Sequence, residues 1–387
     1  KALEVKPKII IAGYSSYPWM PDWQKFREIA DSAGALLLTD VSHIAGLIAA
    51  GVVPSPVGFA HIITFTTHKS MLGPRGACII TDNPDFSKKI DKSIFPGEQG
   101  GPHINTIASM ALAFKLAQTD AFKRLQAQVL KNAVAFADQL QKRGMRVPYQ
   151  GTDTHLVLLD CKTVKAKDGT HLSGEMGARI LDIAGIVANY NTIPGDRSTF
   201  SASGIRFGTH WLTQRGLEPA EFAQIADIIC DLFCAVTPYK MPGRTRTLQH
   251  AKVDFNILED AKRRVIALAE KADPLIDLPK YHGYPHFFSL DDNIEAEWAR
   301  FSLSGDQIRM FLDYTLVSEI ENLDEGESQA TMIHTSEGSI KGVIKCLDPR
   351  TFTLYVPGHQ AGLTSSWLRN LSDGYIKFDA DLMLTVP

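Results

Sequence analysis

The stretch that most constrains this chain covers residues 60–80, which read AHIITFTTHKSMLGPRGACII. An apolar, β-branched run breaks at His68 and Lys69, turns at residues 73–76 and resumes as a second apolar run. A continuous apolar run between turn signals predicts a buried strand. A lysine at the end of a buried strand is costly, because an ammonium group loses its hydration there. The cost disappears if the amine is neutral and covalently bound, as in a Schiff base. A surface lysine at a strand-to-turn junction is the alternative.

The segments before Lys69 also predict strands that end in polar residues. Residues 7–13 (PKIIIAG) and 35–39 (ALLLT) read as strands, and the second leads into Asp40 and His43. Strands that alternate with helices indicate a largely parallel sheet, whose ligands bind at the carboxyl ends of the strands. The pattern therefore predicts that Asp40, His43 and Lys69 lie at one edge of an α/β sheet.

Two further features suit anionic groups. Gly100 and Gly101, within FPGEQGGP, offer backbone N–H groups just before a predicted helix, which is a way to hold phosphate. A plain turn is the alternative there. Arg206, within SASGIRFGTH, offers a planar guanidinium that binds a carboxylate through two parallel hydrogen bonds. Its alternative is a surface salt bridge.

Residues 66–70 (TTHKS) with 73–76 (GPRG) resemble the lysine segment of the serine hydroxymethyltransferases, which depend on pyridoxal 5'-phosphate. Residues 40–47 (DVSHIAGL) are similar to the segment that faces the pyridine nitrogen in that family. The resemblance covers roughly residues 6–272, with the motifs in order. It implies that Lys69 carries the cofactor covalently, that Asp40 keeps the pyridine nitrogen protonated, and that His43 lies near the ring and its phenolic oxygen.

The same resemblance implies further contacts. It suggests cofactor contacts at Ser15, Thr66, His68, Arg75, Gly100 and Gly101, the two glycines reaching the phosphate of a neighbouring subunit. Arg206 would hold the substrate carboxylate, and Asn191 would lie near the pterin of tetrahydrofolate. One departure is Ala202, where the family usually has Thr. No metal ligands are implied.

The family implies a fold and an activity. The expected fold is α/β: the carboxyl half of a fold-type-I pyridoxal-phosphate domain over residues 1–118, then a small α+β domain over residues 119–273. The expected reaction interconverts serine and glycine and passes the hydroxymethyl carbon to tetrahydrofolate. A homodimer or homotetramer with a shared active site is expected.

The chain begins with Lys1 in what reads as the middle of an α/β domain, so we interpret it as a piece of a longer polypeptide. The family's earlier segments would carry the group that stacks on the cofactor ring, a phosphate contact and a proton-transfer glutamate. We therefore expect the 387-residue piece to bind pyridoxal phosphate poorly and to turn over slowly or not at all. A folate-independent, threonine-type aldolase and a non-catalytic fragment are the alternatives.

Residues 274–387 are predicted to form a separate module. A strand over 297–304, a helix over 306–316, β-like runs around Ala330, Ile340 and Phe352, and a helix over 363–371 are similar to the opening half of the aminomethyltransferase (glycine cleavage T-protein) folate-binding domain. That family has an acidic pair where residues 338–343 read GSIKGV, so the resemblance implies a degenerate or scaffolding role. A generic α/β appendage is the alternative.

The rest of the chain predicts conventional elements. Asp22 is the expected N-cap of a helix that Gly34 ends. A long helix is expected over residues 105–143 and a polar loop over 189–198, and residues 274–284 read as a Pro-rich linker. A strand over 155–160 and helices over 174–184, 219–236 and 260–272 complete the predicted small domain.

Composition excludes several classes of protein. A 44% hydrophobic, 21% charged chain with a net charge of −3 is typical of a soluble protein and indicates neither nucleic acid nor membrane binding. Five scattered cysteines do not form a disulfide framework, and Cys230 and Cys234 are interpreted as buried packing residues rather than metal ligands. With no signal peptide and no apolar run long enough to span a bilayer, the default location is cytoplasmic.

Overall fold

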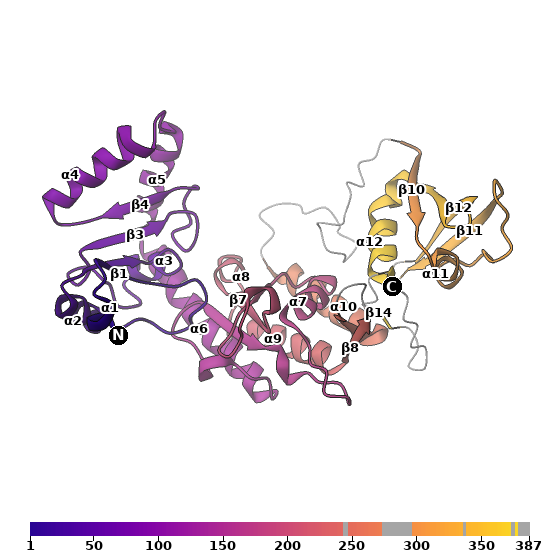
Figure 1. Cartoon of the computed structure of the whole chain (residues 1–387), viewed down its shortest axis with the longest axis horizontal. Helices are drawn as coiled ribbons and strands as arrows, with labels where there is room; N and C mark the ends of the chain where they lie inside the picture. The colour runs from indigo at the N-terminus through magenta and orange to yellow at the C-terminus, as the bar shows by residue number, and fades with distance from the viewer. Residues whose placement is uncertain (243–246, 273–295, 336–337, 373–375, 378–387) are drawn as a thin grey trace. The chain divides into compact units, whose positions relative to one another are not determined.

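The computed structural model describes residues 1–242, 247–272, 296–335, 338–372 and 376–377. They form a mixed α/β structure, which agrees with the predicted fold class at that level. The chain divides into two compact units (Figure 1). Unit 1 comprises residues 1–142, 147–158 and 206–223, and unit 2 comprises residues 143–146, 159–205 and 224–387. The predicted domain limits at 118 and 273 stay predictions.

Unit 1 contains a four-stranded sheet in the order β1-β2-β3-β4 (Figure 1). The strands are β1 (Ile9–Gly13), β2 (Leu36–Asp40), β3 (Ile62–Thr66) and β4 (Ala77–Ile80). The first three are parallel, and β4 returns antiparallel to β3. The parallel strands therefore end at one edge, where Asp40 closes β2 and Lys69 follows β3.

Short-range signals set the helices around this sheet. Helices α1 (Ala2–Val5), α2 (Trp23–Ala33), α3 (Ala45–Ala49) and α4 (Pro84–Lys92) belong to unit 1. Asp22 accepts a hydrogen bond from Lys25 N at the start of α2, and Gly34 ends that helix with a φ of 63°, which confirms both predicted caps. The apolar core of the sheet and its helices includes Ala30, Leu37, Ile44, Leu47, Ile63, Met71 and Val129.

The long helix expected over residues 105–143 is two helices, so that prediction is wrong. Helix α5 (Ile104–Ala117) ends before Thr119, and α6 (Asp120–Lys142) begins after it. Thr119 Oγ1 accepts a hydrogen bond from Phe122 N, so the threonine caps a new helix.

The apolar strands of unit 1 are less buried than the sequence predicts. Side chains on β1 and β4 are exposed, by 68% at Ile11 and 49% at Ile80. Among the described residues of the sheet, Ala12, Leu37 and Ile63 are buried, whereas other apolar positions are exposed. An apolar run predicts a strand that can be buried on both faces. Its actual burial depends on which other elements pack against those faces.

Unit 2 is built around a second sheet, in the order β5-β7-β6. Strands β5 (Leu156–Asp160) and β7 (Gly204–Gly208) begin in one unit and end in the other, whereas β6 (Asn189–Asn191) lies in unit 2. The expected loop at 189–198 therefore starts as a short strand. Helices α7 (Gly174–Ile183) and α9 (Pro219–Cys234) confirm two predicted helices. Helix α8 (His210–Gln214) follows β7 in unit 1.

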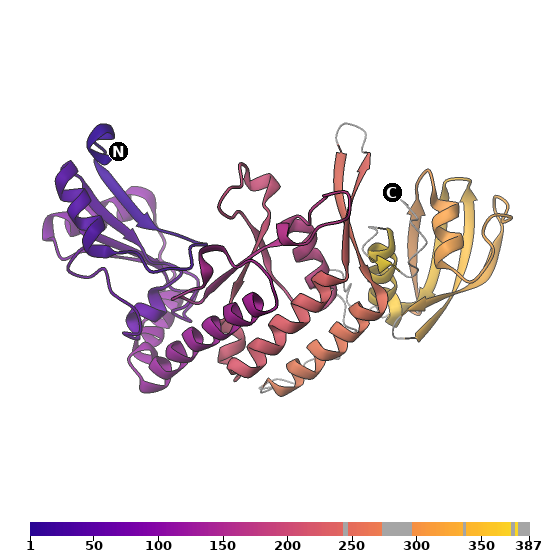
Figure 2. The same cartoon turned by 90° about the horizontal axis from the view of Figure 1, so that it is seen from below.

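The sequence reading missed a long hairpin. Strands β8 (Val236–Pro242) and β9 (Thr247–Asp254) pair antiparallel and stand out as a two-stranded ribbon in Figure 2. Helix α10 (Phe255–Lys271) follows, starting earlier than predicted because the Asp254 side chain accepts from Asn256 N and Ile257 N.

The carboxyl-terminal part of unit 2 holds a four-stranded antiparallel sheet in the order β10-β13-β12-β11. The predicted strands and helices are confirmed as β10 (Trp298–Ser304), α11 (Ile308–Thr315), β11 (Ser328–Thr335), β12 (Gly338–Asp348), β13 (Thr351–Pro357) and α12 (Ala361–Ser372). A two-residue strand, β14 (Ile376–Lys377), pairs with β9. The predicted linker at 274–284 lies outside the described residues.

All five cysteines are free, and Cys230 is buried as expected. Cys234 is exposed, so its predicted burial is wrong: it shares a helix face with Cys230 but is the last residue of α9, where the helix ends. Among the helices that the structure describes, none combines the length and the apolar character needed to cross a bilayer.

Candidate active site

The lysine predicted from the sequence lies in a tight loop that follows β3. Gly73 N donates to Thr67 O at 2.8 Å, Leu72 N donates to Lys69 O, and Thr67 N donates to Gly76 O. The Thr67 hydroxyl also donates to Pro74 O at 2.6 Å. These bonds close residues 67–76 on themselves and hold Lys69 at the carboxyl end of the strand.

The sequence of α3 allows that helix to approach the lysine loop closely. Gly46 N donates to Ser70 Oγ at 2.9 Å, next to Lys69. A Cβ atom at Gly46 would lie 2.1 Å from Ser70 O, so a side chain there would push α3 away from the loop. The glycine in DVSHIAGL is therefore a close-contact position.

Asp40 ends the central parallel strand, between Gly13 and Thr64 in the register of the sheet. Its Oδ1 accepts a hydrogen bond from Ser42 N at 2.9 Å, and Ser42 Oγ in turn accepts from Thr66 N. Gly13 is also a close-contact residue, because a Cβ there would lie 2.5 Å from Asp40 O. The carboxylate is thus held where β2 and β3 both end.

His43 follows Asp40 in the turn before α3, and several charged groups of the site shift its pKa. Burial, followed by the positive charges of Lys69 and Arg206, lowers the pKa of His43 to about 4, against the opposing charge of Asp40. The imidazole is therefore neutral at pH 7. The same electrostatic relations indicate that Lys69, Arg206 and Asp40 all lie around this ring.

Arg206 reaches the site from β7, in the third chain segment of unit 1. Its Nη1 donates to Ser15 O at 2.6 Å, so Ser15 meets the guanidinium through its backbone. Burial lowers the pKa of Arg206 from its usual value. The structure brings Ser15 and Arg206 together, although they are 191 residues apart in the chain.

Two histidines that the sequence reading did not select join this cluster. The His155 ring stacks on His43, with centroids 5.9 Å apart and an interplanar angle of 12°, and it meets His210 edge-on at 4.5 Å. The sequence analysis placed His155 only at the start of a predicted strand over 155–160 and did not consider His210. The available signal was their position in the chain. His155 immediately precedes β5, and His210 closely follows β7, the strand that holds Arg206.

Polar atoms around Lys69 lack partners. Thr66 Oγ1 and His68 Nδ1 are buried and form no hydrogen bond with any described residue. No described residue forms a hydrogen bond or ion pair with the Lys69 amine. Buried polar atoms normally have partners, so two unsatisfied ones in the residues just before Lys69 fit a polar group bound at this place.

Three predicted site residues are not joined to this cluster by any contact described in the structure. Arg75 is exposed in the lysine loop. Gly100 and Gly101 are exposed, a Cβ at either would meet no atom within 4 Å, and Gly101 has a φ of 56°. The two glycines therefore form an open, accessible loop.

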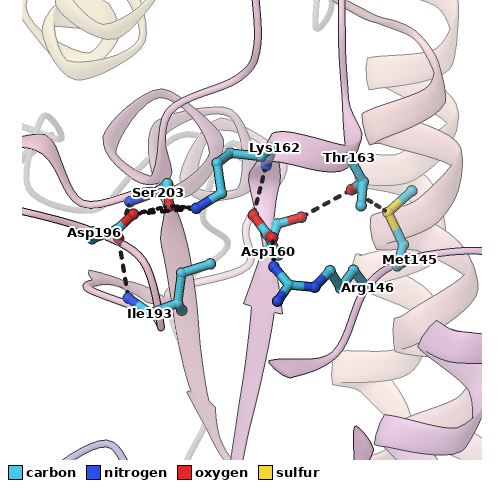
Figure 3. Close-up of polar contacts among 8 residues, drawn as sticks. All are labelled: Met145, Arg146, Asp160, Lys162, Thr163, Ile193, Asp196 and Ser203. Atoms are coloured by element: carbon cyan, nitrogen blue, oxygen red, sulfur yellow. Dashed lines mark hydrogen bonds and ion pairs between the residues drawn. The ribbon is translucent and has the colours of Figure 1, made fainter. Parts of the chain in front are cut away.

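Asn191 belongs to unit 2, at the end of β6, and its Nδ2 donates to Thr192 O at 2.6 Å. The loop after it is held by Asp196, as Figure 3 shows. Asp196 Oδ2 accepts from Ile193 N at 3.0 Å and Ser203 N at 2.9 Å, and Oδ1 accepts from the Ser203 hydroxyl at 2.5 Å. The Lys162 ammonium bonds both Asp196 Oδ1 and Ser203 Oγ. This cluster fixes the loop that carries Asn191.

In the part of the chain that the structure describes, no three His, Cys, Asp or Glu side chains are grouped to hold a metal ion. The three imidazoles contact one another through ring faces and edges instead.

Comparisons with known proteins identify a family. The family described as "Serine hydroxymethyltransferase" matches residues 1–229. The chain is 48% identical over 231 residues to a serine hydroxymethyltransferase of Nostoc punctiforme, which covers 59% of this chain and 53% of that protein. It is 49% identical over 230 residues to a serine hydroxymethyltransferase of Desulfotalea psychrophila, covering 59% of this chain and 52% of that protein. The chain thus spans about half the length of the curated relatives it matches.

Proposed function

The chain belongs to the serine hydroxymethyltransferase family, and on that premise we propose that it serves the interconversion of serine and glycine with transfer of the hydroxymethyl carbon to tetrahydrofolate. The observation that carries the proposal is the grouping of Lys69, Asp40 and Arg206 around His43 within unit 1. An amine, a carboxylate and a guanidinium are the groups needed to bind an aldehyde cofactor and an amino acid together.

The residues present fit pyridoxal 5'-phosphate. The unsatisfied Thr66 Oγ1 and His68 Nδ1 shortly precede a lysine that no described residue bonds, and a polar aromatic cofactor would satisfy such atoms. Lys69 would hold the cofactor covalently, with Asp40 and His43 beside its ring. When bound, the cofactor supplies an electron sink for the substrate α-carbon.

Asp40 and His43 have distinct proposed tasks. Asp40 Oδ1 is occupied by Ser42 N, so Oδ2 is the oxygen proposed to keep a proton on the pyridine nitrogen. His43 stays neutral at pH 7, because its pKa is lowered to about 4 by burial and by Lys69 and Arg206. A neutral imidazole can share a hydrogen bond with the phenolic oxygen without adding a second positive charge.

Arg206 is proposed to bind the substrate carboxylate. The bond from Nη1 to Ser15 O fixes the plane of the guanidinium. A fixed planar fork holds a carboxylate through two hydrogen bonds and so orients the α-carbon. This assigns Ser15 a supporting role through its backbone, together with the predicted cofactor contact.

The finer parts of the proposal follow the family. Residues 1–118 form the carboxyl half of a fold-type-I domain, residues 119–273 the small domain, and residues 274–387 an aminomethyltransferase-like module. Asn191 contacts the folate pterin. Gly100 and Gly101 hold the phosphate of a neighbouring copy, with Arg75 also near the cofactor. A cytoplasmic homodimer or homotetramer is proposed, and the exposed Ile104 and Ile107 of α5 support association between copies.

The experiment begins with covalent capture. The chain is titrated with pyridoxal phosphate, reduced with borohydride and mapped by peptide mass spectrometry. Because binding is expected to be weak, we expect a visible absorbance band and a reduced adduct on Lys69 at the high end of the titration, since only an amine bound to the aldehyde is trapped. Lys69→Ala should lose both signals, whereas Lys88→Ala, which removes an exposed lysine on α4, should keep them.

Serine cleavage then separates the reactions. Cleavage that depends on tetrahydrofolate supports the proposed transfer, and cleavage without it identifies a folate-independent aldolase. An adduct spread over surface lysines, with none on Lys69, would refute the proposal at its first step.

A further inference from the structure

His43 lies at one end of a column of three imidazole rings. His155 stacks on His43 and meets His210 edge-on, at 5.9 Å and 4.5 Å between ring centroids. The three residues come from different chain segments, in the turn after β2, at the start of β5 and at the start of α8. All three belong to unit 1.

The far end of the column is anchored by Gln126 on α6. His210 Nε2 lies 2.9 Å from Gln126 Oε1, and Gln126 Nε2 donates to Ser70 O at 3.2 Å. Because a backbone carbonyl only accepts hydrogen bonds, the amide nitrogen of Gln126 faces Ser70 and its oxygen faces His210. His210 therefore donates through Nε2–H, which sets its tautomer.

These contacts form a closed circuit that includes the lysine loop. Ser70, next to Lys69, accepts from Gly46 N through its hydroxyl, and Gly46 lies in the helix that follows His43. The His43 ring is thus held from two sides, by the turn into α3 and by the column that returns through Gln126 to Ser70. Gln126 is fully buried, so its amide has no solvent to bond instead.

We propose that Gln126, His210 and His155 are positioning residues that hold the His43 ring against the Lys69 centre. The proposal rests on the proposed function and deepens it, because it extends the site to three residues that contact the cofactor only through His43. Its physical basis is rigidity. His43 stacks on His155, His155 meets His210 edge-on, and His210 is tied to a buried amide, so the rings have few alternative rotamers.

Electrostatics around the column favour neutral rings. Burial lowers the pKa of His155 well below its usual value, and the neighbouring His210, His43, Arg206 and Lys69 lower it further. Burial, followed by His43, lowers the pKa of His210 to about 4. The pKa of His43 is also about 4. As the pH falls from about 6.5 toward 4, these histidines are therefore protonated in the unfolded chain before they are protonated in the folded one. The column therefore stabilises unit 1 above that range and loses this contribution on acidification.

The first test uses nitrogen NMR of the histidine rings in the whole chain, without cofactor. We expect the signals of His43, His155 and His210 to remain those of neutral imidazole down to about pH 5, with His210 as the Nε2–H tautomer. Gln126→Glu should raise the pKa of His210 above about 6.5, because a carboxylate beside the ring favours imidazolium. Gln141→Glu, the same change elsewhere on α6, should leave the ring signals unchanged.

The second test asks whether the column positions the site. His210→Phe keeps a ring but removes the donor to Gln126, and it should weaken pyridoxal phosphate binding about fivefold, as expected for one lost hydrogen bond. His210→Gln can place a donor near the Nε2 position and should restore the affinity to within about twofold of the unaltered chain.

The outcomes separate the two proposals. If His210 is the Nδ1–H tautomer, if Gln126→Glu leaves its pKa unchanged, or if His210→Gln binds no better than His210→Phe, the column is not a positioning element. If the unaltered chain captures no pyridoxal phosphate at Lys69, the proposed function fails, and the ring NMR alone then decides the column.

Discussion

Several side chains of this protein are held in place by hydrogen bonds with nearby residues. Asp40 is held by Ser42 N, and Arg206 is held by Ser15 O. Asp196 is the clearest case, because its two oxygens accept four hydrogen bonds, one of which comes from the Lys162 ammonium and is also an ion pair (Figure 3). Removing such a residue affects a whole loop.

Asp196→Asn should destabilise unit 2 by about 2 kcal/mol at neutral pH, because it removes hydrogen bonds to a charged group and leaves Lys162 without its anionic partner. Burial raises the pKa of Asp196, but the hydrogen bonds from Ser203 and Ile193 outweigh it, so the pKa is lowered overall. A carboxylate with a lowered folded pKa stabilises above its unfolded pKa of about 3.9 and loses that contribution as pH falls below it.

Urea unfolding of both proteins at pH 7 and at about pH 3 measures this, and the difference between them should shrink at the lower pH. Asp138→Asn, which changes an exposed residue of α6, is the control. An equal difference at the two pH values would contradict the role assigned to the charge.

At the scale of elements, the lysine loop depends on how closely α3 packs against it. Gly46 N bonds Ser70 Oγ, and the main chains are too close to admit a side chain. The loop, α3 and α6 meet at Ser70, so a shift of one element moves the anchor of the others.

Gly46→Ala should destabilise unit 1 by about 2–3 kcal/mol, because overpacking at a 2.1 Å contact with backbone forces α3 outward. The same change should weaken pyridoxal phosphate binding, since Ser70 moves together with Lys69. Denaturant unfolding and a cofactor titration measure the two effects.

Gly305→Ala is the matched control, because a Cβ there meets no atom within 4 Å and the residue has no positive φ. It should change stability by less than about 0.5 kcal/mol. Similar behaviour of the two variants would mean that the Gly46 contact is not tight.

At the scale of the whole molecule, the candidate site is assembled within one unit from three separate segments. His43 and Lys69 come from the first, His155 from the second, and Arg206 and His210 from the third. The carboxyl-terminal sheet is separate, since β10 to β13 pair only with one another among the described strands.

A chain shortened to residues 1–272 should bind pyridoxal phosphate within about twofold of the 387-residue chain, because Lys69, Asp40, His43, Arg206 and the histidine column all belong to unit 1. Borohydride capture at Lys69, compared between the two chains over a cofactor titration, measures this. A loss of more than about tenfold would show that the carboxyl-terminal module supports the site.

Local sequence determined much of this protein. The Asp22 cap, the glycine stop at Gly34, the turn after β3 and the alternating runs of β10 to β13 depend on neighbours within a few residues, so they can be read from the chain. The positions of Asp40 and Lys69 at strand ends follow from the same patterns.

Only the tertiary structure decided which distant residues meet. Gln126 and His210 are 84 residues apart, and Gln126 and Ser70 are 56 apart, so no local pattern links them. The exposure of Ile11 and Ile80 likewise depends on which layers cover the sheet. Backbone preference acts over a few residues, whereas burial and side-chain contact depend on the whole packed chain.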